Sequence, residues 1–157
     1  MRFQRVISAL AGIFILTGIP YLLYTAVYIL NSPDSSPANK DYDLEPTVSV
    51  VLPTYNEEQI VRSKLNNICE WEYPPEKIEV VVVDSSDDAT PEIIRDFFDD
   101  RKVPKLQLIE ETERRGLAVA LNEAYAAASN EVVVKTDCDS KVAIDALHEA
   151  VANLADP

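Results

Sequence analysis

The fold of this chain is decided by residues 48–58, which read VSVVLPTYNEE. The stretch opens with an apolar run rich in β-branched residues, Val48–Leu52, which Pro53 closes. Three similar runs follow, at Ile78–Val83, Leu106–Ile109 and Val132–Val134. Near-continuous Val and Ile runs of this length are typical of strands that are buried on both faces, as in a parallel sheet.

Segments with helical patterns alternate with these runs. Asn56 is suited to cap a helix with an acidic first turn, and Thr90 is suited to cap a second helix that has proline at its first position. Leu117–Ser129 is alanine-rich, and apolar residues recur on one helical face between Ile144 and Leu154. This order predicts an α/β fold, an open and mostly parallel sheet with helices on both faces and right-handed crossovers.

The chain begins with an apolar segment, because residues 6–30 contain no charge. As a helix they would reach about 37 Å, enough to cross a hydrocarbon core of about 30 Å. We therefore expect a tail and transmembrane helix at residues 1–30, a polar linker at 31–46 and one domain at 47–157. A cleaved signal peptide is the alternative, since Met1–Arg5 is basic.

The charges around the apolar segment bear on its orientation. Arg2 and Arg5 precede it, whereas Asp34, Asp41 and Asp43 follow it. By the positive-inside rule this distribution favours an N-terminus in the cytoplasm and a domain outside.

Composition excludes several kinds of site. The net charge of −13 argues against a nucleic-acid partner, because phosphate backbones are bound by clustered Lys and Arg. Three glycines in the whole chain are too few for a dinucleotide fingerprint or a Walker A loop. Two cysteines and one histidine do not make a four-ligand zinc site. Any metal must be held mainly by oxygen, which indicates Mg²⁺, Mn²⁺ or Ca²⁺.

Polar residues follow three of the expected strands. They are Thr54–Glu57, Asp84–Asp88 and Asp137–Ser140, and in open α/β sheets ligands bind beyond the carboxyl ends of the strands. Asp137 and Asp139, two apart on a loop, can direct oxygens at one divalent cation, which would neutralise a diphosphate leaving group. Acids that cap the following helix are the alternative interpretation.

A further candidate surrounds Gly116, which can supply a turn into the alanine-rich helix. The two arginines before it are able to reach phosphate, and we take Arg115 as the candidate. A solvated turn is the alternative.

Four segments together resemble the family 2 glycosyltransferases, which have the Rossmann-like GT-A fold. They are residues 48–58, Val82–Ser86, Gly116–Asn122 and Thr136–Ser140, in the order that the family shows. The resemblance extends from Val48 to about Leu154. One departure is Leu117, which stands where the family often has a lysine.

The resemblance implies roles for named residues. Pro53 and Thr54 belong to the opening strand and loop that contact the nucleoside, and Tyr55, Glu57 and Asp84 would bind it. Asp137 would lie near the ribose and the metal. Asp139 would ligate the metal, Mg²⁺ or Mn²⁺.

The resemblance also implies an activity. The chain would hold the donor-binding half of a membrane-anchored, hexosyl-type glycosyltransferase that uses a UDP- or GDP-linked sugar. The acceptor would be a polyprenyl phosphate, a glycan or a polysaccharide, and the catalytic base is expected beyond Pro157. Because nucleotide sugars are normally cytoplasmic, we expect a cytoplasmic domain despite the arginine distribution. The alternative is a non-catalytic nucleotide-binding or interaction module from a truncated transferase gene.

Overall fold

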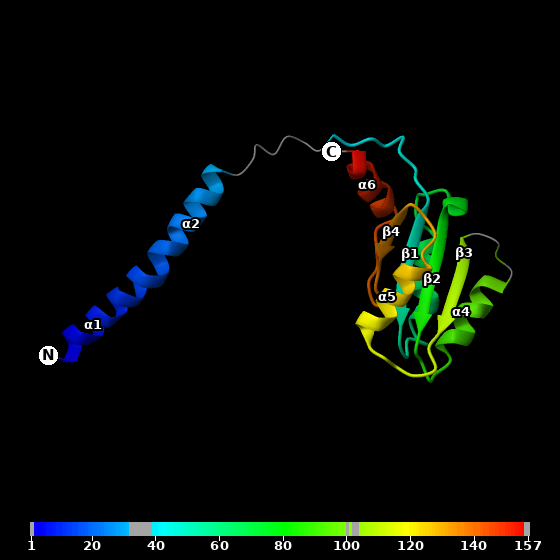
Figure 1. Ribbon diagram of the computed structural model, residues 1–157, viewed down its shortest axis with the longest axis horizontal. Helices are drawn as coiled ribbons and strands as arrows, with labels where there is room; N and C mark the ends of the chain where they lie inside the picture. Colours follow the sequence, from blue (N-terminus) through cyan, green and yellow to red (C-terminus); the bar gives the residue numbers. More distant parts are fainter. Residues whose placement is uncertain (1, 32–38, 100, 102–103, 156–157) are drawn as a thin grey trace. The chain divides into compact units, whose positions relative to one another are not determined.

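The computed structural model describes residues 2–31, 39–99, 101 and 104–155 (Figure 1). The chain divides into two compact units, with the boundary between Ala38 and Asn39. Residues 32–38 of the expected linker lie outside the described residues.

The first unit is one long apolar helix. It consists of α1 (Arg2–Ile13), a π-helical turn (Phe14–Gly18) and α2 (Ile19–Leu30). The π-helical turn precedes Pro20, whose ring removes a backbone donor from the helix. Phe3–Leu30, which contains an 18-residue window with a mean hydropathy of 2.1, is the one helix among the described residues that is long and apolar enough to cross a membrane. A signal sequence would satisfy the same test.

The second unit is built on a parallel four-stranded sheet, which confirms the predicted fold class. The strand order is β3-β2-β1-β4, and all three neighbouring pairs are parallel. The strands are β1 (Val48–Thr54), β2 (Ile78–Asp84), β3 (Lys105–Glu110) and β4 (Val132–Lys135). Each includes the apolar run that predicted it.

Helices cover both faces of the sheet (Figure 1). The helices of this unit are α3 (Val61–Cys69), α4 (Thr90–Asp99), α5 (Leu117–Ala127) and α6 (Ala146–Ala152), with short 3-10 turns at Pro75–Lys77 and Asn153–Ala155. On one face α3, α4 and α6 pack against β1 and β2 around the fully buried Leu52. On the other face Ala120 and Ala124 of α5 pack against Val51, Val81 and Val83.

The segment just before β1 belongs to this unit and packs on its core. The amide of Asp41 donates to the carbonyl of Ala152 (3.0 Å), and Leu44 packs on the core. The hydroxyl of Tyr73 donates to the carbonyl of Pro46.

Two local expectations are wrong. Asn56 does not cap α3, which begins five residues later. It has φ of 56°, and its side-chain oxygen accepts the amide of Asp87 (3.0 Å), so it joins two loops instead. Burial on both faces holds for β1 and β2 only. β3 and β4 are the edge strands, and Val133 is 43% exposed.

Candidate functional site

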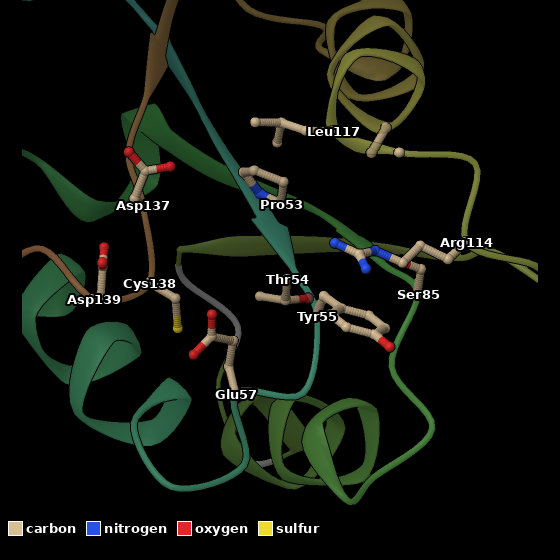
Figure 2. A pocket seen from close by; sticks show the side chains of 12 residues that line it. Pro53, Thr54, Tyr55, Glu57, Ser85, Arg114, Leu117, Asp137, Cys138 and Asp139 are labelled. Atoms are coloured by element: carbon tan, nitrogen blue, oxygen red, sulfur yellow. The ribbon is translucent and has the colours of Figure 1, made fainter.

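A cavity of about 350 Å³ opens at the carboxyl edge of the sheet. The strand order runs from β1 through β2 to β3 and then returns to the other side of β1 at β4, so it reverses between β1 and β4. Ligands of open α/β sheets bind at such a reversal. The lining residues are Pro53, Thr54, Tyr55, Glu57, Ser85, Arg114, Gly116, Leu117, Ala120, Asp137, Cys138 and Asp139 (Figure 2).

The cavity has two chemically different ends. Figure 2 shows Asp137, Asp139 and Glu57 on one side, and Tyr55 and Arg114 on the other. The first end is acidic, and the second combines an aromatic ring with a guanidinium group. An elongated ligand with a metal-bound anionic part and a flat ring would match both.

At the acidic end, burial raises the pKa of Glu57, and the negative charges of Asp139 and Asp88 add to this effect. Cys138 lies between the two aspartates and is 7% exposed. Burial and then the charge of Glu57 raise the pKa of its thiol to about 12, so the thiol stays protonated at neutral pH. Because the thiolate is the form that ligates metals, the protonated and buried Cys138 packs rather than ligates.

The donor set of the acidic end suits a hard cation. Asp137 and Asp139 both line the cavity with carboxylates, the ligands that Mg²⁺ and Mn²⁺ prefer. One oxygen of Asp137 is paired with the ammonium of Lys135. Among the described residues no group of three or more His, Cys, Asp or Glu side chains could hold a metal ion. A cation here would therefore need further ligands from a bound phosphate or from water.

Of the predicted site residues, Asp84 and Arg115 are absent from the lining. Asp84 is 2% exposed, and its carboxylate accepts hydrogen bonds from the hydroxyls of Thr54 (2.6 Å) and Ser86 (2.7 Å). It also accepts the amide of Ser86 at 3.1 Å. Asp84 thus fixes the ends of β1 and β2 under the cavity.

The two adjacent arginines differ in their surroundings. The guanidinium of Arg115 is paired with Glu111 and Glu123. That of Arg114 lies 3.9 Å from the centre of the Tyr55 ring and, among the described residues, is the one basic group in the lining. Arg114 rather than Arg115 therefore lines this cavity, and the assignment of Arg115 to the nucleotide sugar stays a prediction.

The family follows from comparison with known proteins. The model for "Glycosyl transferase family 2" matches residues 49–157. The chain belongs to glycosyltransferase family 2. This match confirms the resemblance to family 2 glycosyltransferases that the four sequence segments indicate.

Solved structures of family 2 relatives share this architecture. The mannosyltransferase PcManGT from Pyrobaculum calidifontis, in complex with GDP-Man and Mn²⁺, is 44% identical with a TM-score of 0.82. That comparison covers 95% of this chain and 44% of the other. S. aureus TarS 1-349 in complex with UDP-GlcNAc is 31% identical with a TM-score of 0.61, covering 68% of this chain and 30% of the other.

A curated relative points the same way. The dolichyl-phosphate hexose transferase of Haloferax volcanii is 42% identical over 92 residues, which are 59% of this chain and 36% of the relative. This family 2 chain therefore spans less than half of the relatives and structures named here.

Proposed function

We propose that this chain is the donor-binding part of a membrane-anchored glycosyltransferase that transfers a hexose from a nucleotide-diphosphate sugar with the help of a divalent cation. One observation carries the proposal: a single cavity combines the Asp137 and Asp139 carboxylates with Tyr55 and Arg114. Its volume of about 350 Å³ falls within the range of small-molecule sites.

At the aromatic end we assign Tyr55 to the base and Arg114 to the diphosphate. In the structure Arg114 covers the Tyr55 ring, which is 39% exposed. When Arg114 turns to a phosphate, the ring becomes free to stack on the base. Guanidinium groups bind phosphate through charge-assisted hydrogen bonds, and aromatic rings stack on any base. Pro53, Thr54 and Ser85 line the cavity around this end.

At the acidic end we assign Asp137 and Asp139 to the cation, Mg²⁺ or Mn²⁺. The Mn²⁺ in the PcManGT complex supports this assignment. A cation there would neutralise the charge that develops on the leaving diphosphate. Glu57 lies at the same end, where burial, followed by the negative charges of Asp139 and Asp88, raises its pKa.

The donor's nucleotide is GDP or UDP, since PcManGT holds GDP-Man and TarS holds UDP-GlcNAc. We propose that the acceptor is lipid-linked or a polysaccharide. The similarity to the dolichyl-phosphate hexose transferase of Haloferax volcanii supports the lipid-linked acceptor. Phe3–Leu30 would anchor the chain, with the domain in the cytoplasm. Protease protection of the domain in right-side-out vesicles tests that placement, and digestion from outside would contradict it.

Calorimetry of the full chain in detergent tests donor binding. UDP- and GDP-linked sugars are titrated with Mn²⁺, with Mg²⁺ and with EDTA. We expect one class to bind with a micromolar dissociation constant when a cation is present and at least 10-fold more weakly in EDTA. The matched variants are Asp139→Asn, which should lose the cation dependence, and Asp96→Asn on α4, which should keep it. Absence of binding for every nucleotide sugar, with the protein folded, would overturn the proposal.

A further inference from the structure

The helix behind the acidic end, α3, presents two buried polar side chains to the loop after β4. Lys64 is 2% exposed and Asn67 is 5% exposed. Three residues apart, they share one face of the helix. A buried ammonium loses its hydration, and it is tolerated only where hydrogen bonds replace the lost water. The face of α3 that carries Lys64 and Asn67 therefore binds this loop through polar contacts, where an apolar face would be ordinary.

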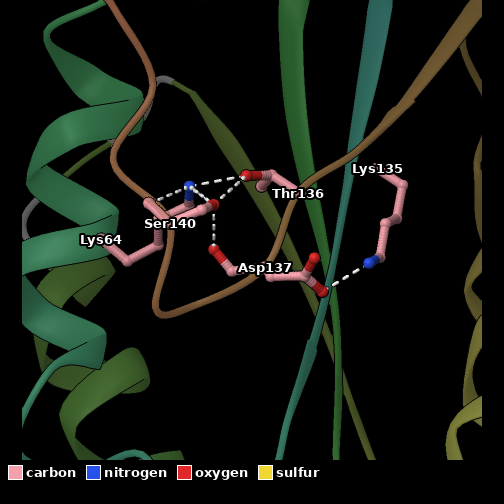
Figure 3. A network of polar contacts seen from close by, with 5 residues as sticks. All are labelled: Lys64, Lys135, Thr136, Asp137 and Ser140. Atoms are coloured by element: carbon pink, nitrogen blue, oxygen red, sulfur yellow. Dashed lines mark hydrogen bonds and ion pairs between the residues drawn. The ribbon is translucent and has the colours of Figure 1, made fainter.

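All three N–H donors of Lys64 have partners on the loop (Figure 3). The Nζ atom donates to Oγ1 of Thr136 at 2.6 Å, to the carbonyl of Ser140 at 2.8 Å and to Oγ of Ser140 at 3.2 Å. The Ser140 hydroxyl in turn lies 2.8 Å from the carbonyl oxygen of Asp137, to which it donates. Lys64 thus binds the loop at Thr136 and at Ser140, on either side of the segment that carries Asp137 and Asp139.

Asn67 binds the same loop slightly further along the chain, at Val142. Its side-chain amide donates to the carbonyl of Val142 at 2.9 Å, and its oxygen accepts the amide of Val142 at 2.9 Å. Lys64 itself is absent from the lining of the main cavity. It lines a smaller neighbouring cavity with Cys138, Asp139 and Ser140, and its hydrogen bonds go to the loop.

We propose that Lys64 is a positioning residue that, through Thr136 and Ser140, sets the relative placement of Asp137 and Asp139 for the cation. This inference rests on the proposed function. A lysine that only tied α3 to the sheet would stabilise the fold without affecting metal binding selectively. A metal site misplaced by about 1 Å loses most of its affinity, whereas the aromatic end of the cavity would be unaffected.

The test compares Lys64→Met with a matched surface control, Lys77→Met, whose ammonium pairs with Glu45. In the full chain in detergent, Mn²⁺ binding in the presence of GDP or UDP is followed by electron paramagnetic resonance. The affinity for GDP and UDP in EDTA is measured alongside. We expect Lys64→Met to weaken Mn²⁺ binding at least 10-fold and to leave the EDTA value within twofold. Lys77→Met should change neither.

Thr136→Val and Ser140→Ala keep the test decisive if Lys64→Met does not fold. Each removes one acceptor of the ammonium, and we expect each to weaken Mn²⁺ binding several-fold with the EDTA value unchanged. Folded variants with the wild-type Mn²⁺ affinity and resonance signature would overturn the positioning role alone. So would a parallel loss of the metal-dependent and metal-independent affinities. A wild-type chain with no Mn²⁺-dependent nucleotide binding would overturn the proposed function as well.

Discussion

Replacing Arg114 with methionine removes the one basic group that the described part of the chain contributes to the cavity lining, and it keeps an apolar stem of similar length. A charge-assisted hydrogen bond to phosphate contributes about 1.5–3 kcal/mol. In the free protein the guanidinium first has to leave the Tyr55 ring, 3.9 Å away, a contact that is worth about 0.5–1 kcal/mol at an exposed site. The net loss is about 1–2 kcal/mol, which is roughly a 5- to 30-fold weaker binding of the nucleotide.

The neighbouring residue supplies the control. Arg115→Met removes an equal charge from the next position, but that guanidinium is paired with Glu111 and Glu123 outside the cavity lining. We expect Arg115→Met to change the affinity by less than twofold. The affinity of both variants for GDP and UDP is measured by calorimetric titration at a fixed Mn²⁺ concentration. The salt concentration is about 0.15 M, so that charges are screened as they are under physiological conditions. An Arg115→Met loss as large as that of Arg114→Met would refute the reasoning.

Three further predictions concern stability. Burial alone would raise the pKa of Glu79, but hydrogen bonds from Ser49 and Ser129 outweigh it and the pKa is lowered. The stabilisation that Glu79 provides is therefore complete above the ordinary pKa near 4.5 and is lost as the pH falls through the lower pKa of the folded state. Glu79→Gln should lower the free energy of unfolding in urea by about 1.5–3 kcal/mol at pH 7 and should weaken the loss of stability at acidic pH. An unchanged loss of stability at acidic pH would contradict this. Gly116 has φ of 95° and no atom within 4 Å of an added Cβ, so Gly116→Ala should cost about 1–3 kcal/mol through backbone conformation alone, read from thermal unfolding; an unchanged midpoint would exclude that strain. Leu52 is fully buried, and Leu52→Ala should cost about 2–5 kcal/mol by the same assay, whereas a loss under 1 kcal/mol would mean that the core closes around the gap.

The strands were predictable because their signal is local. Four apolar runs rich in β-branched residues occur at four places in the chain, and each became a strand within two residues of its expected ends. The extension of β1 through Pro53 to Thr54 was not predictable. It depends on the pairing with β2, whose register places Pro53 opposite Val83 and Thr54 opposite Asp84.

Features that depend on distant partners escaped sequence reasoning. Asn56 reads as a helix cap, yet its turn is fixed by the loop at Asp87, 31 residues away. Lys64 reads as an ordinary helical lysine, yet its acceptors, Thr136 and Ser140, lie 72 and 76 residues further along the chain. Which of Arg114 and Arg115 lines the cavity depends on the path of the chain into α5. Two adjacent identical residues do not reveal that path.

The binding of a divalent cation by Asp137 and Asp139, beside a bound nucleotide, is the central element of the proposed function. Crystals of the protein grown with Mn²⁺ and GDP-mannose or UDP-GlcNAc, measured at a wavelength where manganese scatters anomalously, locate the cation directly. We predict one strong peak about 2.0–2.6 Å from a carboxylate oxygen of Asp139, within contact of Asp137, with diphosphate oxygens completing the shell. A nucleotide bound with no manganese at these two aspartates, or manganese bound elsewhere on the domain, would contradict the account.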